Sequence, residues 1–278
     1  LKYIGTAGSA YFFKNTGTTN SLVLENLEFD GDGTGDGASA KAKYVARMDN
    51  GDPTGTSNLF IDNCVAHDFN DKFIKPYGNN GMDSLVVTNS VFYNGASEGI
   101  VLYSGSSSDP AAVINHSIIE NCTFYDIERE AIKGQTHPDN VVRISNVTVV
   151  RCGNVENKAM MYFRDMTDVV VKNSIFAHST NADAGEEFVD MASDASLFHN
   201  NAWWDIVNSE VGNGTVSDTV NVNPQFADAA NGDFHLPVGS ALLTFGDDGG
   251  LIGDPRWDST PPHPLTGTWK LAPVPGAM

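Results

Sequence analysis

Short segments in which apolar and polar residues alternate recur along the chain, and each carries an asparagine near its centre. They include SLVLENLEF from Ser21, SLVVTNSVF from Ser84 and DVVVKNSIF from Asp168. Successive asparagines are separated by 37, 26, 32, 25, 27 and 28 residues. A repeat of this length predicts a solenoid of stacked coils. The asparagines are Asn26, Asn63, Asn89, Asn121, Asn146, Asn173 and Asn201.

The alternation changes phase at each asparagine. Leu22 and Leu24 stand four and two positions before Asn26, whereas Leu27 and Phe29 stand one and three positions after it. A period of two belongs to a β-strand, and its phase changes only where the chain turns a corner. Asn is the non-glycine residue that best tolerates the left-handed conformation such a corner needs. We therefore expect the asparagine column to be structural.

A third apolar strand is expected in each coil, at residues 44–48, 73–76, 99–103, 131–134, 160–164 and 188–191. Three strands in a unit of about 25 residues, stacked ~4.8 Å apart, predict an all-β, single-stranded right-handed parallel β-helix of about seven or more coils. We expect it to span residues 1–257, with a closing segment from about residue 205. The proline-rich residues 258–278 are expected to form a linker or to begin a further domain.

Composition excludes several classes of protein. The 278 residues are 41% hydrophobic, which is ample for a folded core. Sixteen basic residues against 35 acidic ones give a formal charge of −19, so a duplex nucleic-acid partner is not expected. The chain has no run of about 18 apolar residues, so we expect no membrane span.

The three cysteines are far apart, and none is in a C-x-x-C motif. They are Cys64, Cys122 and Cys152. The repeat places Cys64 and Cys122 in one inward column, two coils and therefore ~9.6 Å apart. This separation exceeds the reach of a disulfide, so free thiols are expected.

The asparagine ladder, over about residues 21–204, resembles that of the pectate-lyase-like superfamily. The resemblance implies a groove along the third strands but no particular reaction, because such helices host lyases, hydrolases, epimerases and adhesins. The stretch NPQFADAANGDFHLPVGSALL from Asn223, followed by GGLIGDPRW up to Trp257, resembles the closing segment of secreted β-helix proteins of polysaccharide-degrading bacteria. It implies a secreted or cell-surface protein of a Gram-negative bacterium. We interpret the chain as an internal piece of a larger protein, whose further domains or neighbouring copies cover its ends.

The outward positions of the third strands carry a basic stripe. Such a stripe would neutralise an acidic polysaccharide. Alternatively, each cation pairs with a nearby acid such as Asp49, Asp71, Glu130 or Asp165, because outward Lys and Arg are common on sheets. The stripe with its companions comprises Arg47, Lys75, Tyr103, Lys133, Arg164 and Asp190. The substrate-binding residues predicted from it are Arg47, Lys75, Tyr103 and Tyr162.

Glu128 and Glu130 in DIEREAIKGQT, and Arg164 in AMMYFRDMTDVVVKNSIF, resemble the alginate lyase and chondroitinase B family. The resemblance implies calcium at the two glutamates, a catalytic base at Lys133 and a catalytic Arg164 one coil later. Aligned without a gap, the family's lysine falls on Gln135, so Lys133 fits only if two residues are deleted. β-Elimination at a uronate needs a base for the C5 proton and a cation beside the carboxylate. We expect the Cα atoms of Lys133 and Arg164 to be ~5 Å apart across the ladder.

A second calcium candidate is the acidic, glycine-rich segment DGDGTGDG. Asp30, Asp32 and Asp36 alternate there as in a calcium loop, although the glutamate that closes an EF-hand is missing. A glycine-rich excursion between coils explains the segment equally well. No organic cofactor is expected.

Three classes of function remain open from the sequence. The first is a lyase that acts on an acidic polysaccharide. The second is a non-catalytic carbohydrate-binding module. The third is a structural or adhesive module that contacts neighbouring copies. Hydrolysis by a pair of carboxylates would draw on Asp126, Glu128, Glu130, Asp165 and Asp190.

Overall fold

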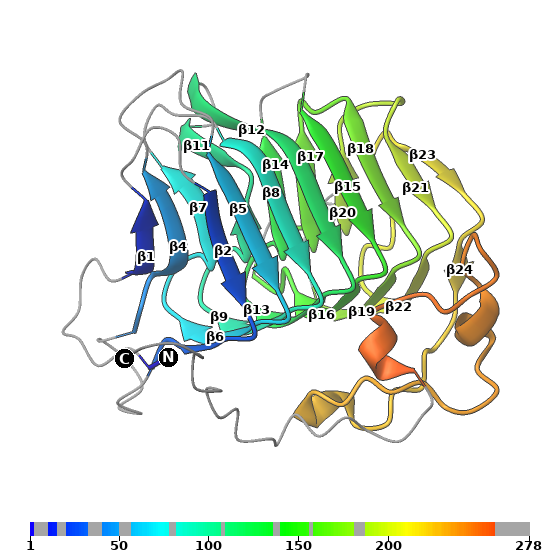
Figure 1. The fold of residues 1–278 in the computed structure, drawn as a ribbon. Coiled ribbons are helices and arrows are strands. Elements are labelled where there is room, and N and C mark those ends of the chain that lie inside the picture. Colours follow the sequence, from blue (N-terminus) through cyan, green and yellow to red (C-terminus); the bar gives the residue numbers. More distant parts are fainter. Residues whose placement is uncertain are drawn as a thin grey trace.

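The computed structural model describes residues 1–2, 11–15, 21–32, 41–49, 57–77, 82–106, 109–135, 140–155, 158–180 and 187–258. Strands from successive coils pair in parallel and form three sheets along the length of the molecule (Figure 1). This arrangement confirms the predicted all-β parallel β-helix with three strands in each coil. Within these ranges the helices are short 3-10 turns, and none is long and apolar enough to span a membrane.

The sheets are named in the order in which the chain enters them. The first sheet contains β1 (Tyr11–Asn15), β4 (Tyr44–Asp49), β7 (Ile74–Tyr77), β10 (Ile100–Val101), β14 (Ile132–Gln135), β17 (Met161–Arg164) and β20 (Val189–Met191). The second contains β2 (Ser21–Glu25), β5 (Asn58–Asp62), β8 (Met82–Thr88), β12 (Asp109–Glu120), β15 (Val141–Ser145), β18 (Asp168–Lys172), β21 (Leu197–His199) and β23 (Thr215–Ser217), with β11 (Tyr103–Ser106) antiparallel to β12. The third contains β3 (Glu28–Asp30), β6 (Val65–Phe69), β9 (Val91–Gly95), β13 (Thr123–Ile127), β16 (Thr148–Cys152), β19 (Ile175–Ser179), β22 (Ala202–Ile206) and β24 (Val220–Asn221).

Inward side chains of all three sheets form one continuous core. Because strands alternate their faces, residues at the same position of successive coils stack in columns. Phe92 and Phe124 lie in one such column with their rings stacked 5.2 Å apart, and Phe176 is fully buried in the same column. Each coil is therefore held by the two coils beside it.

The first corner, between the second and third sheets, is the predicted asparagine column. Asn26, Asn63, Asn89, Asn121, Asn146 and Asn173 all have φ between 49° and 57°. The backbone N–H of each donates to a carbonyl of the next coil, as Asn121 does to Ser145 at 3.2 Å. The prediction for the seventh coil is wrong by one residue, because Asn200 is the left-handed corner with φ 52°. Asn201 is instead buried, and its side chain accepts a hydrogen bond from the Ser174 N–H at 2.8 Å.

Replacing a corner asparagine with alanine should destabilise the protein. Asn121→Ala puts alanine in the left-handed region, where its side chain cannot form the local hydrogen bonds that asparagine forms. The change costs about 1–2 kcal/mol. It also removes the 3.2 Å hydrogen bond from the Asn121 amide to Asn89. Asn121→Gly loses the same hydrogen bond but accepts the conformation, so it should cost less. Urea unfolding of both variants measures the difference, and a glycine variant less stable than the alanine variant would contradict this role.

The expected free thiols are confirmed. Cys64, Cys122 and Cys152 are all buried and unpaired with one another. Cys64 and Cys122 lie in one inward column, separated by Ser90 of the intervening coil, whose hydroxyl accepts a hydrogen bond from the Cys64 N–H at 3.0 Å. Burial raises the pKa of Cys152 to about 12, so this thiol is unreactive in the folded protein.

A second corner, which the sequence analysis missed, follows five positions after the first. Here the third-sheet strand bends toward the first sheet, and polar side chains line the outside. Arg151 forms a bidentate ion pair with Asp126 of the preceding coil, at 2.6 and 2.9 Å. The left-handed residues of this column are Asp68, Asn94, Asp126, Arg151, His178 and Asp205, with φ between 52° and 62°.

The coils continue past the expected boundary near residue 205, because β23 and β24 still pair in the sheets. Residues 223–258, named the closing segment, contain η1 (Ala229–Asn231), η2 (Ala241–Thr244) and η3 (Pro255–Trp257). They lie against the third sheet and the first corner, in yellow to red in Figure 1. The N–H of Gly253 donates to the Asn173 carbonyl at 2.7 Å. Gly253 has φ +84°, and a Cβ there would stand 2.8 Å from the Ile175 side chain. Only glycine therefore fits at this contact.

Candidate functional site

The outer face of the first sheet carries the predicted basic stripe, but in a different register. Pairing is direct between Arg47 and Lys75, between Val101 and Lys133, and between Tyr162 and Asp190. Lys133 pairs with Tyr162, whereas Arg164 pairs with Gln135. The prediction that the Cα atoms of Lys133 and Arg164 lie ~5 Å apart is therefore wrong, because the two residues are diagonal across the ladder. The row is Arg47, Lys75, Val101, Lys133, Tyr162 and Asp190.

Lys133 is engaged by two buried carboxylates. Its Nζ atom lies 3.0 Å from Glu130 Oε1 and 3.6 Å from Glu98 Oε1. It also lies 5.2 Å from the ring centroid of Tyr162, which is a cation–π distance. Burial alone would lower the pKa of Lys133, but Glu130, Tyr103 and Glu98 together raise the pKa above the ordinary value. Lys133 is therefore an ammonium at neutral pH.

Glu98 is the centre of a group of charges, two buried carboxylates and three partly exposed cations, that the sequence analysis missed. Only 4% exposed, it lies 3.0 Å from Lys72 and 3.2 Å from Arg129. Burial alone would raise the pKa of Glu98, but the Ser97 hydroxyl and the Lys72 ammonium lower it to about 2. We name Lys72, Glu98, Arg129, Glu130 and Lys133 the Glu98 cluster. Glu98 and Glu130 stand just before strands of adjacent coils, and the Gly99 N–H donates to the Glu130 carbonyl.

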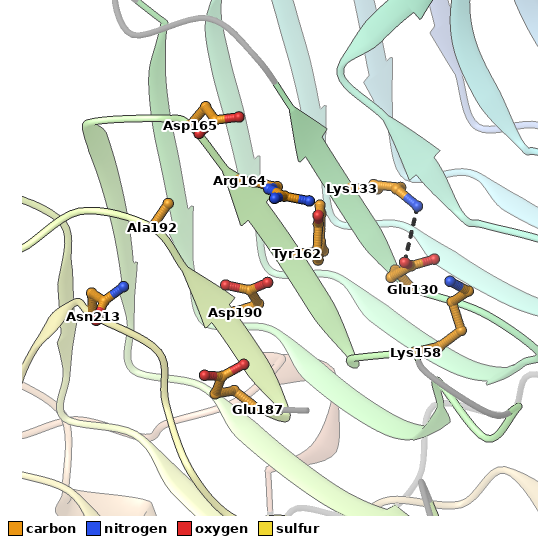
Figure 2. Close-up of a pocket in the computed structure, with 10 residues that line it drawn as sticks. All are labelled: Glu130, Lys133, Lys158, Tyr162, Arg164, Asp165, Glu187, Asp190, Ala192 and Asn213. Carbon is orange, nitrogen blue, oxygen red and sulfur yellow. Dashed lines mark hydrogen bonds and ion pairs between the residues drawn. The ribbon is translucent and has the colours of Figure 1, made fainter. Parts of the chain in front are cut away.

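A pocket of about 510 Å³ opens beside this cluster on the first sheet (Figure 2). Arg164, the last residue of β17, is exposed at its rim. The pKa of Arg164 is raised, first by a hydrogen bond with the Tyr162 hydroxyl and then by the charges of Asp165 and Asp190. Among the described residues, Arg164 forms no ion pair with a carboxylate. The pocket is lined by Glu130, Lys133, Lys158, Tyr162, Arg164, Asp165, Glu187, Asp190, Ala192 and Asn213.

The remaining predicted binding residues lie beyond this pocket. Lys75 is half-buried in β7, and burial together with the Lys72 ammonium lowers the pKa of Lys75. The Arg47 guanidinium lies 5.9 Å from the Tyr11 ring centroid. Tyr103 is the first residue of β11, which is antiparallel to β12 and lies outside the first sheet. Burial raises the pKa of Tyr103. The structure therefore brings Lys133, Tyr162 and Arg164 together, with Arg47 and Lys75 in earlier coils.

The two glutamates at which the resemblance implies calcium, Glu128 and Glu130, stand in different surroundings. Glu128 is exposed, whereas Glu130 is buried with one oxygen bonded to Lys133. Across the described ranges, neither belongs to a group of three metal-ligating side chains. The second oxygen, Glu130 Oε2, is buried and has no hydrogen-bond partner among the described residues.

Asp30 has neighbours that were not predicted, in addition to Asp32. Its carboxylate lies with His67 and Asp68, and ligand atoms of the three are all within 4.8 Å of one another. These groups already have partners, since Lys2 lies 3.3 Å from Asp30 and Asp68 lies 2.7 Å from His67. The Asp32 N–H donates to Asp30 Oδ1 at 3.0 Å. Asp36 lies outside the described residues.

A second pocket, of about 520 Å³, follows the second corner beneath the closing segment. The Arg151–Asp126 pair lines it, together with His178, whose Nδ1 lies 2.8 Å from Asp205. The Arg151 guanidinium also donates to the Ala229 carbonyl at 2.7 Å. These contacts attach the closing segment to the coils.

Comparison with known proteins places the first-sheet pocket in a recognised sequence unit. No curated protein matches the sequence. Residues 117–257 match DUF5123, a domain of unknown function. The matched region begins in β12, contains all ten residues that line the first-sheet pocket, and ends at Trp257 in η3. Because the match covers half of the sequence, the chain belongs to the DUF5123 family.

Proposed function

We propose that this chain is a secreted or cell-surface β-helix of the pectate-lyase-like kind that binds an acidic polysaccharide in the first-sheet pocket. The observation that carries the proposal is Arg164. This exposed guanidinium forms no ion pair among the described residues and stands beside an aromatic ring in a pocket of about 510 Å³. Small-molecule sites have volumes of this order.

The chemistry of the pocket suits a sugar acid. A guanidinium can bind a carboxylate through two parallel hydrogen bonds. The Tyr162 ring offers an apolar surface to the C–H face of a sugar. Carboxylates such as Asp190 and Glu187 accept hydrogen bonds from hydroxyl groups, and the Asn213 amide can both donate and accept. Lys133, held protonated by Glu130, adds positive charge beside the ring.

Lyase activity on the same face is a second candidate, and it is favoured by Lys75. In β-elimination a base takes the C5 proton of the uronate, and the C4 oxygen leaves as the double bond forms. A base must be neutral to accept the proton, and the pKa of Lys75 is lowered whereas that of Lys133 is raised. Arg47 stands directly across the ladder from Lys75. Catalysis by Lys133 and Arg164, and assistance by calcium, stay predictions from the sequence.

A binding assay with a glycan panel tests the proposal. The intact chain is titrated with alginate, polygalacturonate, glycosaminoglycans and a neutral glucan, and ultraviolet absorbance is followed for unsaturated uronates. We expect one acidic glycan to bind, with affinity that falls as salt rises. Arg164→Ala should weaken binding about 10- to 100-fold, which corresponds to the loss of a charged hydrogen bond. Turnover that is lost in Lys75→Ala and kept in Lys133→Ala would identify the lyase.

The matched control is Arg143→Ala. Arg143 is an outward arginine of β15 on the second sheet, 2.7 Å from Asp168, so the variant changes the net charge equally at another face. It should bind as the unmodified chain does. If Arg143→Ala and Arg164→Ala weakened binding equally, binding would depend on the net charge of the protein and not on the pocket. If no acidic glycan binds, the proposal fails, and a structural module that contacts further domains or neighbouring copies becomes the better explanation.

A further inference from the structure

The Tyr162 ring divides the outer face of the first sheet. Outward side chains stand roughly perpendicular to a sheet, and neighbouring coils are ~4.8 Å apart. Lys133 precedes Tyr162 in the row and Asp190 follows it. Figure 2 shows the ring nearly edge-on, with Lys133 on one side and Asp190 on the other. Lys133 therefore covers one face of the ring, at 5.2 Å from the centroid, and the opposite face is turned toward Asp190.

The wall opposite the ring is formed by the next coil. Asp190 projects from β20, and Glu187 precedes that strand. The following chain closes against β20, since the Asn213 N–H donates to the Met191 carbonyl at 2.7 Å. Gly212 packs so closely there that a Cβ would stand 2.8 Å from backbone atoms of Met191. The part of the pocket beyond the ring, named the slot, lies between an aromatic face and a wall of hydrogen-bond acceptors, whereas Glu130, Lys133 and Lys158 line the part on the other side of the ring.

The charges of the slot suit one acidic group. Of the charged residues that line the whole pocket, three are basic and four are acidic. Lys133 is already paired with Glu130 and Lys158 is half-buried, so Arg164 is the exposed cation that a ligand meets at the rim. A ligand with several carboxylates would meet Asp165, Glu187 and Asp190 and be repelled. A ligand with one carboxylate and several hydroxyls would satisfy both sides.

We infer, on the basis of the proposed function, that the slot holds a single uronate residue stacked on the free face of Tyr162. Its carboxylate binds Arg164, and its hydroxyls donate to Asp190 and Glu187. A polysaccharide that ran along the solenoid axis would have to cross the Tyr162 ring. The site therefore recognises the end or a branch of an acidic glycan, and not an internal run of uronates.

The inference is tested with ligands of increasing length. Glucuronate, galacturonate and their oligomers of two to six units are titrated into the intact chain by calorimetry and saturation-transfer NMR, with glucose and glucosamine as controls. A uronate monosaccharide should bind, and affinity should change less than about threefold from two to six units. Glucose should bind at least tenfold more weakly than the uronate. Tyr162→Ala should weaken uronate binding at least tenfold, and Tyr162→Phe, which keeps the ring, should weaken it less.

The outcomes separate the two proposals. Affinity that rises steadily with every added unit shows an extended groove, which overturns the slot and leaves the proposed function intact. Stronger binding of glucosamine than of glucuronate overturns the assignment of the acidic group. If Tyr162→Ala binds the uronate as tightly as the unmodified chain and has the same melting temperature, the sugar does not stack on Tyr162. If no acidic ligand of any length binds, the proposed function fails as well.

Discussion

Glu98→Gln should lower the free energy of unfolding by about 3 kcal/mol, because its removal leaves two half-buried lysines short of a partner. Glu98 is 4% exposed and is the shared partner of Lys72, Arg129 and Lys133. Glutamine keeps the shape but not the charge. Urea unfolding at neutral pH measures the loss. The matched control is Glu128→Gln, an exposed glutamate of the next coil, which should change stability by less than about 0.5 kcal/mol.

The same carboxylate makes the fold sensitive to acid. The pKa of Glu98 is lowered from its ordinary value of 4.5 to about 2 in the folded chain. A lowered carboxyl pKa contributes stability that is present above the unfolded value and is lost as pH falls through the folded value. The contribution is about 3 kcal/mol, and it should disappear between pH 4.5 and about 2. Glu98→Gln should lack this part of the pH dependence. Parallel stability curves for the two proteins would show that Glu98 is not the titrating group.

Trp257→Ala should destabilise the chain by about 3–5 kcal/mol, the usual cost of truncating a buried large aromatic residue. Trp257 is 4% exposed and packs at right angles to Phe234, with ring centroids 5.5 Å apart. Its Nε1–H donates to the Thr123 hydroxyl at 2.7 Å, and that hydroxyl donates to the buried Asp254 at 2.7 Å. Loss of the ring therefore removes packing and also the hydrogen bond that the buried Thr123 hydroxyl accepts.

Hydrogen exchange locates this effect. Trp257→Ala should expose the amides of residues 223–258 first, because the closing segment is held by side-chain contacts while the coils are held by ladders. Trp257→Phe keeps most of the packing and should cost about 1–2 kcal/mol. Full protection of the closing segment in Trp257→Ala would contradict this account. The family match ends at the same residue, which is consistent with the closing segment being part of the folded unit.

The corners show how far a repeat can be read from sequence. The change of phase in the apolar alternation predicted six left-handed asparagines, because the residue at which the phase changes is also the residue with a positive φ. In the seventh coil two asparagines are adjacent, and the pattern alone could not decide between Asn200 and Asn201. The second corner was missed because its residues differ in type, from Asp126 to Arg151 and His178. Its constant spacing of five positions after the first corner was the available signal.

The pocket was harder to predict than the fold. The loops that lead into the first sheet differ in length between coils, so the register of its strands cannot be counted from the corner. The sequence therefore predicted Lys133 beside Arg164, whereas the ladder pairs Lys133 with Tyr162. Glu98 carries no motif, and its importance comes from contacts with residues up to 35 positions away, such as Lys133. Long-range pairing of this kind is visible only in the folded chain.

A crystal structure of the chain soaked with the uronate oligosaccharide that binds tightest tests the central claim most directly. The account predicts sugar density on the first sheet, with one ring against Tyr162 and a carboxylate on Arg164. Ligand density in the pocket between Arg151 and the closing segment, with the first-sheet pocket containing only solvent, would contradict it.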